Sequence, residues 1–132
     1  MSQEQVEIVQ GAFAAHRGGG VDAAMPSLTP DAVWYFDAEE WVEDLAYRGH
    51  EGIRAAHAVW VENLDDFGFD VHEIRDLGEQ VLVLADITGF VRDSGQPARL
   101  SMNLIADVGG GLITQVHTFT DLERALAGAR PP

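Results

Sequence analysis

Three strands joined by two tight turns are predicted in residues 80–121, QVLVLADITGFVRDSGQPARLSMNLIADVGGGLITQVHTFTD. Apolar and β-branched residues favour strands in three segments, 80–93, 99–108 and 112–121. Between them, DSG at 93–95 and GGG at 109–111 are typical of turns. Strands that follow one another through such short turns pair antiparallel, so this stretch predicts a sheet.

The residues before this stretch predict helices mixed with two further strands. Apolar spacing over residues 3–16 favours a helix, and the glycines at 18–20 end it because glycine tolerates the backbone turn beyond a helix. The other predicted elements are a short helix after Asp22, a strand over 32–37, an acidic loop over 37–46, a helix over 51–64, a strand over 67–77 and a closing helix over 122–127. This segregation of helices and strands predicts an α+β fold with helices on one face of a curved sheet.

Four short segments add to this order of elements: IVQGAF at 8–13, TPDAVW at 29–34, YRGHEGIR at 47–54 and GGLI at 110–113. Together they resemble the nuclear transport factor 2-like superfamily, and within it the SnoaL-like polyketide cyclases and ketosteroid isomerases. The resemblance covers nearly the whole chain and implies one domain over residues 1–132. It also implies a cone-shaped barrel of a strongly bent antiparallel sheet, with about three helices on the concave face and a pocket for a small apolar molecule.

Charge and composition exclude several classes of function. The formal net charge of −14 repels phosphate backbones and anionic lipid surfaces, so we expect neither nucleic-acid nor membrane binding. Cysteine is absent, which excludes thiol nucleophiles and thiolate metal sites. All eight basic residues are arginine, and a chain without lysine forms no lysine Schiff base. We see no secretion signal and no membrane-length apolar run, and we expect a cytoplasmic location.

Comparison with the resembling enzymes shows which catalytic residues this chain lacks. The isomerase's general base position holds Phe36, and its oxyanion-hole tyrosine position holds Ala12. Similar epoxide hydrolases place a second aspartate where this chain has Thr118. The resemblance therefore does not carry either complete catalytic set onto this sequence.

Asp86 is the predicted catalytic carboxylate. The resemblance places it on the pocket face of its strand with Leu84 and Thr88, which we expect to contact the substrate. A carboxylate among apolar side chains loses hydration, so its pKa should rise and suit it to acid–base work. In the alternative, the strand register differs and Asp86 faces water, or it makes a structural hydrogen bond.

Three other polar residues are predicted near the pocket. His57 shares a helical stripe with apolar residues and could share a proton with Asp86, or it could be a structural core histidine. Asn103 could stabilise a developing oxyanion, or bond a neighbouring strand. His16 could enter the pocket, although capping of the first helix near Gly18 is the favoured reading.

Aromatic side chains are expected to form the pocket wall. A separate apolar stripe is expected to form a dimer interface. Trp34, Phe36 and Trp60 should line one cavity with His57 and, together with Thr118, contact the substrate. On the strand that carries Asn103, we expect an outward-facing apolar stripe that a second copy of the chain covers, formed by Met102, Leu104 and Ala106.

These residues predict an enzyme that acts on a small, mostly apolar molecule bearing a carbonyl or an epoxide. Proton transfer of this kind needs no cofactor, and the histidines lack the HxH or HExxH spacing of a metal site. The alternative is a non-catalytic module that binds a small ligand or forms dimers. The two differ in whether Asp86 lies beside His57 in a closed pocket or faces solvent.

Overall fold

The computed structural model describes residues 2–36, 45–78 and 80–119. Its elements are α1 (Ser2–Ala24), the 3-10 helix η1 (Met25–Ser27), β1 (Leu28–Phe36), β2 (Leu45–Arg48), α2 (Gly49–Asn63), β3 (Leu64–Asp76), β4 (Gln80–Val91), β5 (Pro97–Gly109) and β6 (Leu112–Phe119). Within these ranges, no helix combines the length and the apolar character that crossing a membrane requires. The predicted closing helix, residues 122–127, lies outside the described residues.

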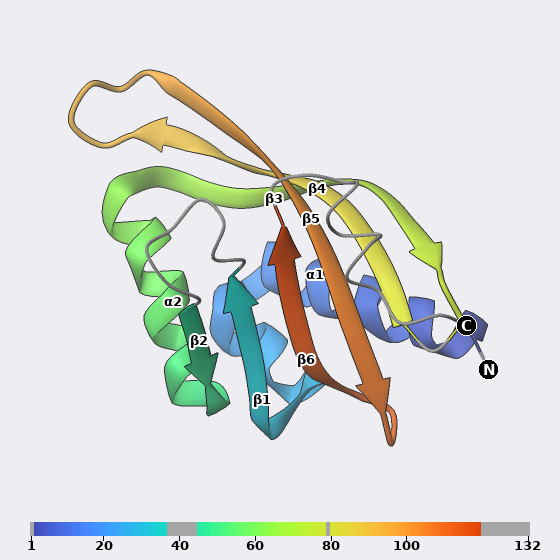
Figure 1. Ribbon diagram of the computed structural model, residues 1–132. Helices are drawn as coiled ribbons and strands as arrows, with labels where there is room; N and C mark the ends of the chain where they lie inside the picture. Colours follow the sequence, from blue (N-terminus) through green and yellow to red (C-terminus); the bar gives the residue numbers. More distant parts are fainter. Residues whose placement is uncertain (1, 37–44, 79, 120–132) are drawn as a thin grey trace.

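The six described strands form one curved sheet in the order β2-β1-β6-β5-β4-β3 (Figure 1). The strands of the 80–121 stretch pair antiparallel as predicted, with β4 against β5 and β5 against β6. The α+β class is therefore confirmed. A wholly antiparallel sheet is wrong, because β1 joins β6 in parallel with Trp34 opposite Val116.

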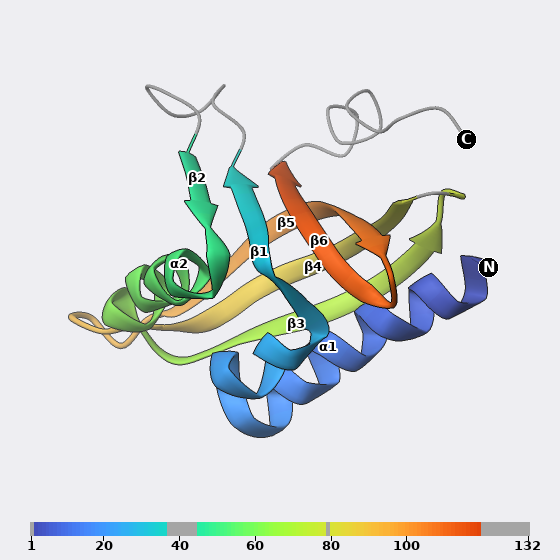
Figure 2. The ribbon, with the colours of Figure 1, turned by 90° about the horizontal axis from the view of Figure 1, so that it is seen from below.

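Both long helices pack on one face of the sheet, which we call the inner face (Figure 2). The two helices predicted on either side of the glycines at 18–20 form α1, which is interrupted at Gly20 (φ 79°, ψ −163°). A positive φ is readily adopted only by glycine, so this residue supplies the break that the sequence predicted. The helix predicted over 51–64 is α2 and begins two residues earlier, at Gly49.

The main core lies between the inner face and the helices. On β4 the inward residues are Val81, Val83, Ala85 and Ile87, and on β5 they are Met102, Leu104 and Ala106. The opposite, outer face carries a smaller buried cluster of Leu82, Ile105 and Phe119. Because side chains alternate along a strand, this assignment decides the side on which every residue of β4 and β5 lies.

The turn between β5 and β6 fixes the register that produces this assignment. Gly110 and Gly111 form its two central positions with φ of 61° and 83°. Positive φ at both positions matches the twist of antiparallel strands and favours glycine. The turn predicted at residues 109–111 is confirmed, and it aligns Ala106 with Val116 on the inner face.

Candidate functional site

A small cavity of about 110 Å³ lies between the inner face of the sheet and the two helices. Its lining is apolar apart from two histidines and one tryptophan: Val9, Ala12, Phe13, His16, Val21, Ala24, Met25, Leu28, Trp34, Ile53, His57, Phe69, Val83, Leu104, Ala106, Ile113 and Val116. His16 and His57 are the only ionisable side chains among these residues. We call this space the histidine cavity.

His16 and His57 contact each other directly across the histidine cavity. The Nε2 atom of His16, on α1, lies 2.9 Å from the Nε2 atom of His57, on α2. The ring of Phe67 packs edge-on against both imidazoles, with centroids 5.9 Å from His16 and 5.0 Å from His57. The ring of Phe69 lies 5.0 Å from His16 in a similar arrangement. Two helices and two aromatic rings of β3 therefore hold the pair in place.

Burial keeps this histidine pair neutral near pH 7. Loss of hydration lowers the pKa of His16, and a positive charge on His57 lowers it further. Loss of hydration also lowers the pKa of His57, while the carboxylate of Asp22 acts in the opposite direction. In a neutral pair, one Nε2 atom carries the hydrogen and donates it while the other accepts it. The pair thus presents one proton donor and one proton acceptor to the same small space.

The sequence indicated an inward helical stripe for His57 and left a pocket position open for His16, and their contact is the part it missed. Capping by His16 is wrong, because its Nε2 atom contacts His57 and its side chain lines the cavity. His16 follows Val9 and Ala12 on the helix face that lines the cavity. That spacing was the available signal for an inward His16.

Trp34 and Thr118 form a buried polar contact on the inner face, close to the histidine cavity. The indole Nε1–H of Trp34 donates to Thr118 Oγ1 at 2.6 Å. Thr118 has an exposed fraction of 2% and does not line either of the two inner-face cavities. Contact of Thr118 with the substrate stays a prediction, and its hydroxyl is bonded to Trp34.

A second cavity, of about 360 Å³, lies farther along the inner face. Its lining consists of Phe36, Tyr47, Ala56, Val59, Trp60, Asn63, Leu64, Ile87, Ala98 and Leu100. The prediction of one cavity shared by Trp34, Phe36, Trp60 and His57 is therefore wrong. Trp34 and His57 line the histidine cavity, whereas Phe36 and Trp60 line the second cavity.

Asp86 lies on the outer face, and its predicted place in the pocket is wrong. It pairs with Ser101 between Ala85 and Ile87, which both face the inner core. Leu84 and Thr88 share its parity and so also lie on the outer face. Both faces of β4 are rich in apolar residues, so strand alternation alone did not distinguish the pocket side.

The charge state of Asp86 is also opposite to the prediction. Its exposed fraction is only 8%, but its Oδ2 atom lies 2.6 Å from Arg99 Nη1 and 2.9 Å from His72 Nε2. The hydrogen bond from Arg99, followed by that from His72, lowers the pKa of Asp86. These contacts outweigh the effect of burial, so the group is a structural carboxylate held in its charged form.

Asn103 also lies on the outer face, opposite Leu84 of β4. Its Nδ2 atom donates to the carbonyl of Phe119 at 3.4 Å, which matches the alternative of a bond to a neighbouring strand. Its neighbours Met102, Leu104 and Ala106 are buried in the inner core. The apolar stripe from which the dimer was predicted is therefore not on the outer surface, and the dimer itself stays a prediction.

One group of possible metal ligands occurs in the described part of the chain, on the outer face. One ligand atom each from Asp70, His72 and Asp86 lies within 4.8 Å of the others. Arg99 Nη1 already contacts both carboxylates, at 2.9 Å from Asp70 and 2.6 Å from Asp86. A metal ion would have to displace this guanidinium, so we interpret the group as an ion-pair network.

The SnoaL-like domain description matches residues 9–116, which is most of the chain. The chain belongs to the SnoaL-like domain family. The matched range includes both histidines and every lining residue of the two cavities. Among proteins with curated descriptions, none matches the chain significantly.

Solved structures of similar fold accompany this family match. A candidate SnoaL-like polyketide cyclase from Jannaschia sp. CCS1 has a TM-score of 0.75 and 24% identity, over 98% of this chain and 94% of its own. A protein with a ketosteroid isomerase-like fold from Catenulispora acidiphila DSM 44928, in complex with trimethylamine, has a TM-score of 0.72 and 20% identity, over 96% and 94%. An NTF2-like protein from Burkholderia thailandensis E264 has a TM-score of 0.75 and 22% identity, over 96% and 97%. At these identities the similarity shows the fold.

Proposed function

We propose that this SnoaL-like domain is an enzyme that uses the His16–His57 pair for acid–base chemistry on a small, neutral, mostly apolar molecule bearing a carbonyl or an epoxide. The observation that carries the proposal is the 2.9 Å contact between the two Nε2 atoms within an otherwise apolar cavity. Perturbed titratable groups in a closed apolar pocket are frequent at catalytic sites. Asp86 and Asn103 have no part in this mechanism, because they lie on the other face of the sheet.

The substrate's polar group would replace the hydrogen bond between the two histidines. For a carbonyl compound, the unprotonated Nε2 atom takes a proton from the carbon next to the carbonyl. The Nε2–H group of the other histidine donates a hydrogen bond to the carbonyl oxygen and stabilises the enolate that forms. The imidazolium formed in the first step is paired with the enolate and then returns a proton to the carbon or to the oxygen, so no unpaired charge is left in the apolar cavity.

The lining of the histidine cavity supports a neutral substrate. It contains no arginine and no carboxylate that could pair with a charged ligand. Burying an unpaired ion in such surroundings is costly, whereas apolar side chains bind an apolar body by excluding water. For an epoxide, the Nε2–H group would hydrogen-bond the ring oxygen, while the unprotonated Nε2 atom takes a proton from the attacking water and then passes it to the alkoxide formed by ring opening.

Deuterium exchange into a small ketone tests this proposal. Cyclopentanone in D₂O, followed by proton NMR, should lose its α-hydrogens faster with the protein than with buffer alone. His16→Gln and His57→Gln should each lower the catalysed rate by about a hundredfold or more, the usual range for loss of a general acid or base. The catalysed rate should also fall between pH 7 and pH 5, because a protonated pair has no acceptor nitrogen.

The matched control is His72→Gln, which changes a histidine on the outer face and should leave the exchange rate unchanged. Equal rates for the wild type and the His57→Gln variant would overturn the proposal. Binding of cyclopentanone without exchange at any pH would instead identify a non-catalytic ligand-binding domain, the alternative that the apolar lining also fits. Hydrolysis of cyclopentene oxide provides the same comparison for the epoxide.

A further inference from the structure

The two inner-face cavities follow one another along the same strands, with one layer of side chains between them. On β4, Val83 lines the histidine cavity and Ile87 the second cavity. These residues are four positions apart, or roughly 13 Å at about 3.3 Å per residue. Ala85 lies between them on the same face and lines neither cavity.

Strand β5 repeats this arrangement with a larger side chain in the middle. Leu104 lines the histidine cavity and Leu100 the second cavity, while Met102 lies between them and lines neither. Met102 is buried in the inner core directly opposite Ala85. The sheet side of the partition is thus a short alanine beside a long, flexible methionine.

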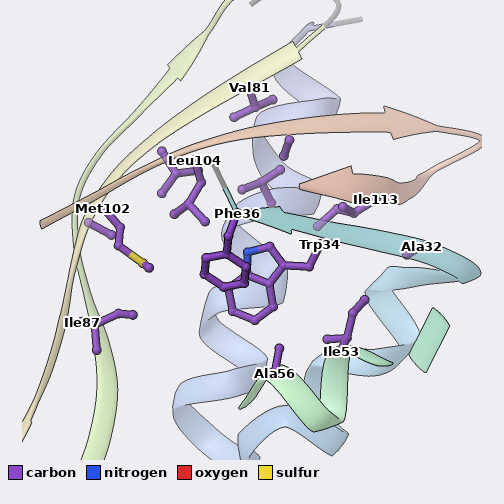
Figure 3. Close-up of a cluster of buried hydrophobic side chains, with 14 of the residues drawn as sticks. Ala32, Trp34, Phe36, Ile53, Ala56, Val81, Ile87, Met102, Leu104 and Ile113 are labelled. Carbon is purple, nitrogen blue, oxygen red and sulfur yellow. The ribbon is translucent and has the colours of Figure 1, made fainter. Parts of the chain in front are cut away.

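An aromatic pair from β1 completes the partition. The rings of Trp34 and Phe36 lie against each other with centroids 4.9 Å apart at an angle of 30°. Trp34 lines the histidine cavity and Phe36 the second cavity. Figure 3 shows the two rings between Met102 on the sheet and Ala56 on α2.

The volume of the partition therefore comes from side chains and not from backbone. Ala56 and Ala85 contribute one methyl group each, whereas Phe36, Trp34 and Met102 fill most of the space. Trp34 is bonded to Thr118, which leaves Phe36 and Met102 as the large residues without a polar anchor. Shortening either of them would open a passage between the cavities without changing the helices or strands that form the walls.

We propose that Phe36 and Met102 determine the size of the molecule that reaches the histidine pair. The histidine cavity, at about 110 Å³, is smaller than the roughly 150 Å³ cavity that holds benzene in an engineered protein. With the partition in place, it accepts a molecule no larger than one small ring. Without the partition, an elongated apolar molecule extends from the second cavity to the histidines. The catalytic consequence rests on the proposed function, but the size limit applies to binding alone.

The tryptophans allow each cavity to be monitored separately. In a Trp41→Phe/Trp60→Phe background, Trp34 reports on the histidine cavity. The further emission of the Trp41→Phe single variant, which keeps Trp34 in the partition, comes from Trp60 and reports on the second cavity. Titration with 2-nonanone, a long neutral ketone, should change Trp60 emission and leave Trp34 emission unchanged. Cyclopentanone should change Trp34 emission.

Opening the partition should reverse the response of Trp34. In Phe36→Ala, 2-nonanone should change Trp34 emission and bind about tenfold more tightly, as expected when further methylene groups are buried. Met102→Ala should act in the same direction from the sheet side. Phe36→Leu keeps most of the side-chain volume and should give an intermediate response. The matched control is Leu100→Ala, which enlarges the second cavity away from the partition. In this variant 2-nonanone should leave Trp34 emission unchanged.

The proposal is overturned if 2-nonanone changes Trp34 emission in the reporter background that retains both Phe36 and Met102. It is also overturned if Trp34 stays unchanged in both Phe36→Ala and Met102→Ala while circular dichroism shows that these variants are folded. If Phe36→Ala unfolds, Phe36→Leu and Met102→Ala decide the question. All of these measurements report binding. Failure of the deuterium-exchange experiment would therefore not overturn the size limit, and failure of the binding experiments would not overturn the proposed acid–base function.

Discussion

The two faces of the sheet stabilise opposite charge states of their ionisable groups: the neutral form on the inner face and the charged form on the outer face. On the inner face, His16 and His57 lie among aromatic and aliphatic side chains, and burial lowers both pKa values toward the neutral form. On the outer face, Asp86 is less exposed than the two half-buried histidines, but Arg99 and His72 lower its pKa and keep it charged. The partners of a group, and not its depth alone, therefore decide which protonation state the protein stabilises.

The largest expected effect comes from placing a carboxylate on the inner face. Leu104 is buried beside the histidine cavity and has no cationic neighbour in its lining. Leu104→Asp should lower the free energy of unfolding at pH 7 by about 3–5 kcal/mol, the cost of an uncompensated buried charge. Urea denaturation followed by circular dichroism measures this loss.

The control for this change is Leu84→Asp, on the outer face and only partly buried. Its loss of stability should be clearly smaller, because water reaches the new carboxylate. Equal losses at the two positions would show that the faces do not differ in the way described above.

A smaller effect is expected when the charge of Asp86 is removed. Asp86→Asn should lower stability at pH 7 by about 1 kcal/mol, since Arg99 keeps Asp70 as a partner. A lowered folded pKa contributes stability above the unfolded value, about 3.8, and this contribution is lost as pH falls through the folded pKa. The difference between wild type and variant should therefore narrow below about pH 3.8 in urea titrations. The catalysed rate of deuterium exchange into cyclopentanone should be unchanged in this variant. Loss of that exchange would show that Asp86 takes part in the mechanism.

The smallest expected effect is the pH dependence that the histidine pair gives to stability. Both folded pKa values lie below the usual value of 6.5, so the unfolded chain binds protons first as pH falls. Wild-type stability should decrease from pH 7 to pH 5. The double variant His16→Leu/His57→Leu should show a flatter profile than the wild type. An unchanged slope in the double variant would mean that the pair is not desolvated as described.

Local sequence patterns predicted most of the elements and few of the long-range pairings. Glycine-rich turns, strand alternation and helical stripes located α1, α2 and the strands to within a few residues. β2 was missed because it is four residues long and follows an acidic, loop-like segment. The parallel pairing of β1 with β6 was also missed, because it joins strands far apart in the chain and no local signal marks it.

The candidate site was predicted less well, and the reason lies in the register of β4 and β5. A shift by one residue exchanges every side chain between the two faces, and β4 has apolar residues on both. β5 held the clearer signal, because Met102, Leu104 and Ala106 are uniformly apolar while their neighbours Ser101 and Asn103 are polar. If that stripe is assigned to the inner core, Asp86 falls on the outer face. His57 and His16 are then the ionisable residues left for the pocket.

The hydrogen bond between Trp34 and Thr118 also has a consequence for synthesis of the chain. These residues are 84 positions apart, and β1 meets β6 only when both have left the ribosome. At about 5–20 residues per second, roughly 4 to 17 s pass between the two events. During that interval one edge of β1 and the indole of Trp34 have no native partner. Formation of the complete sheet therefore follows translation of β6.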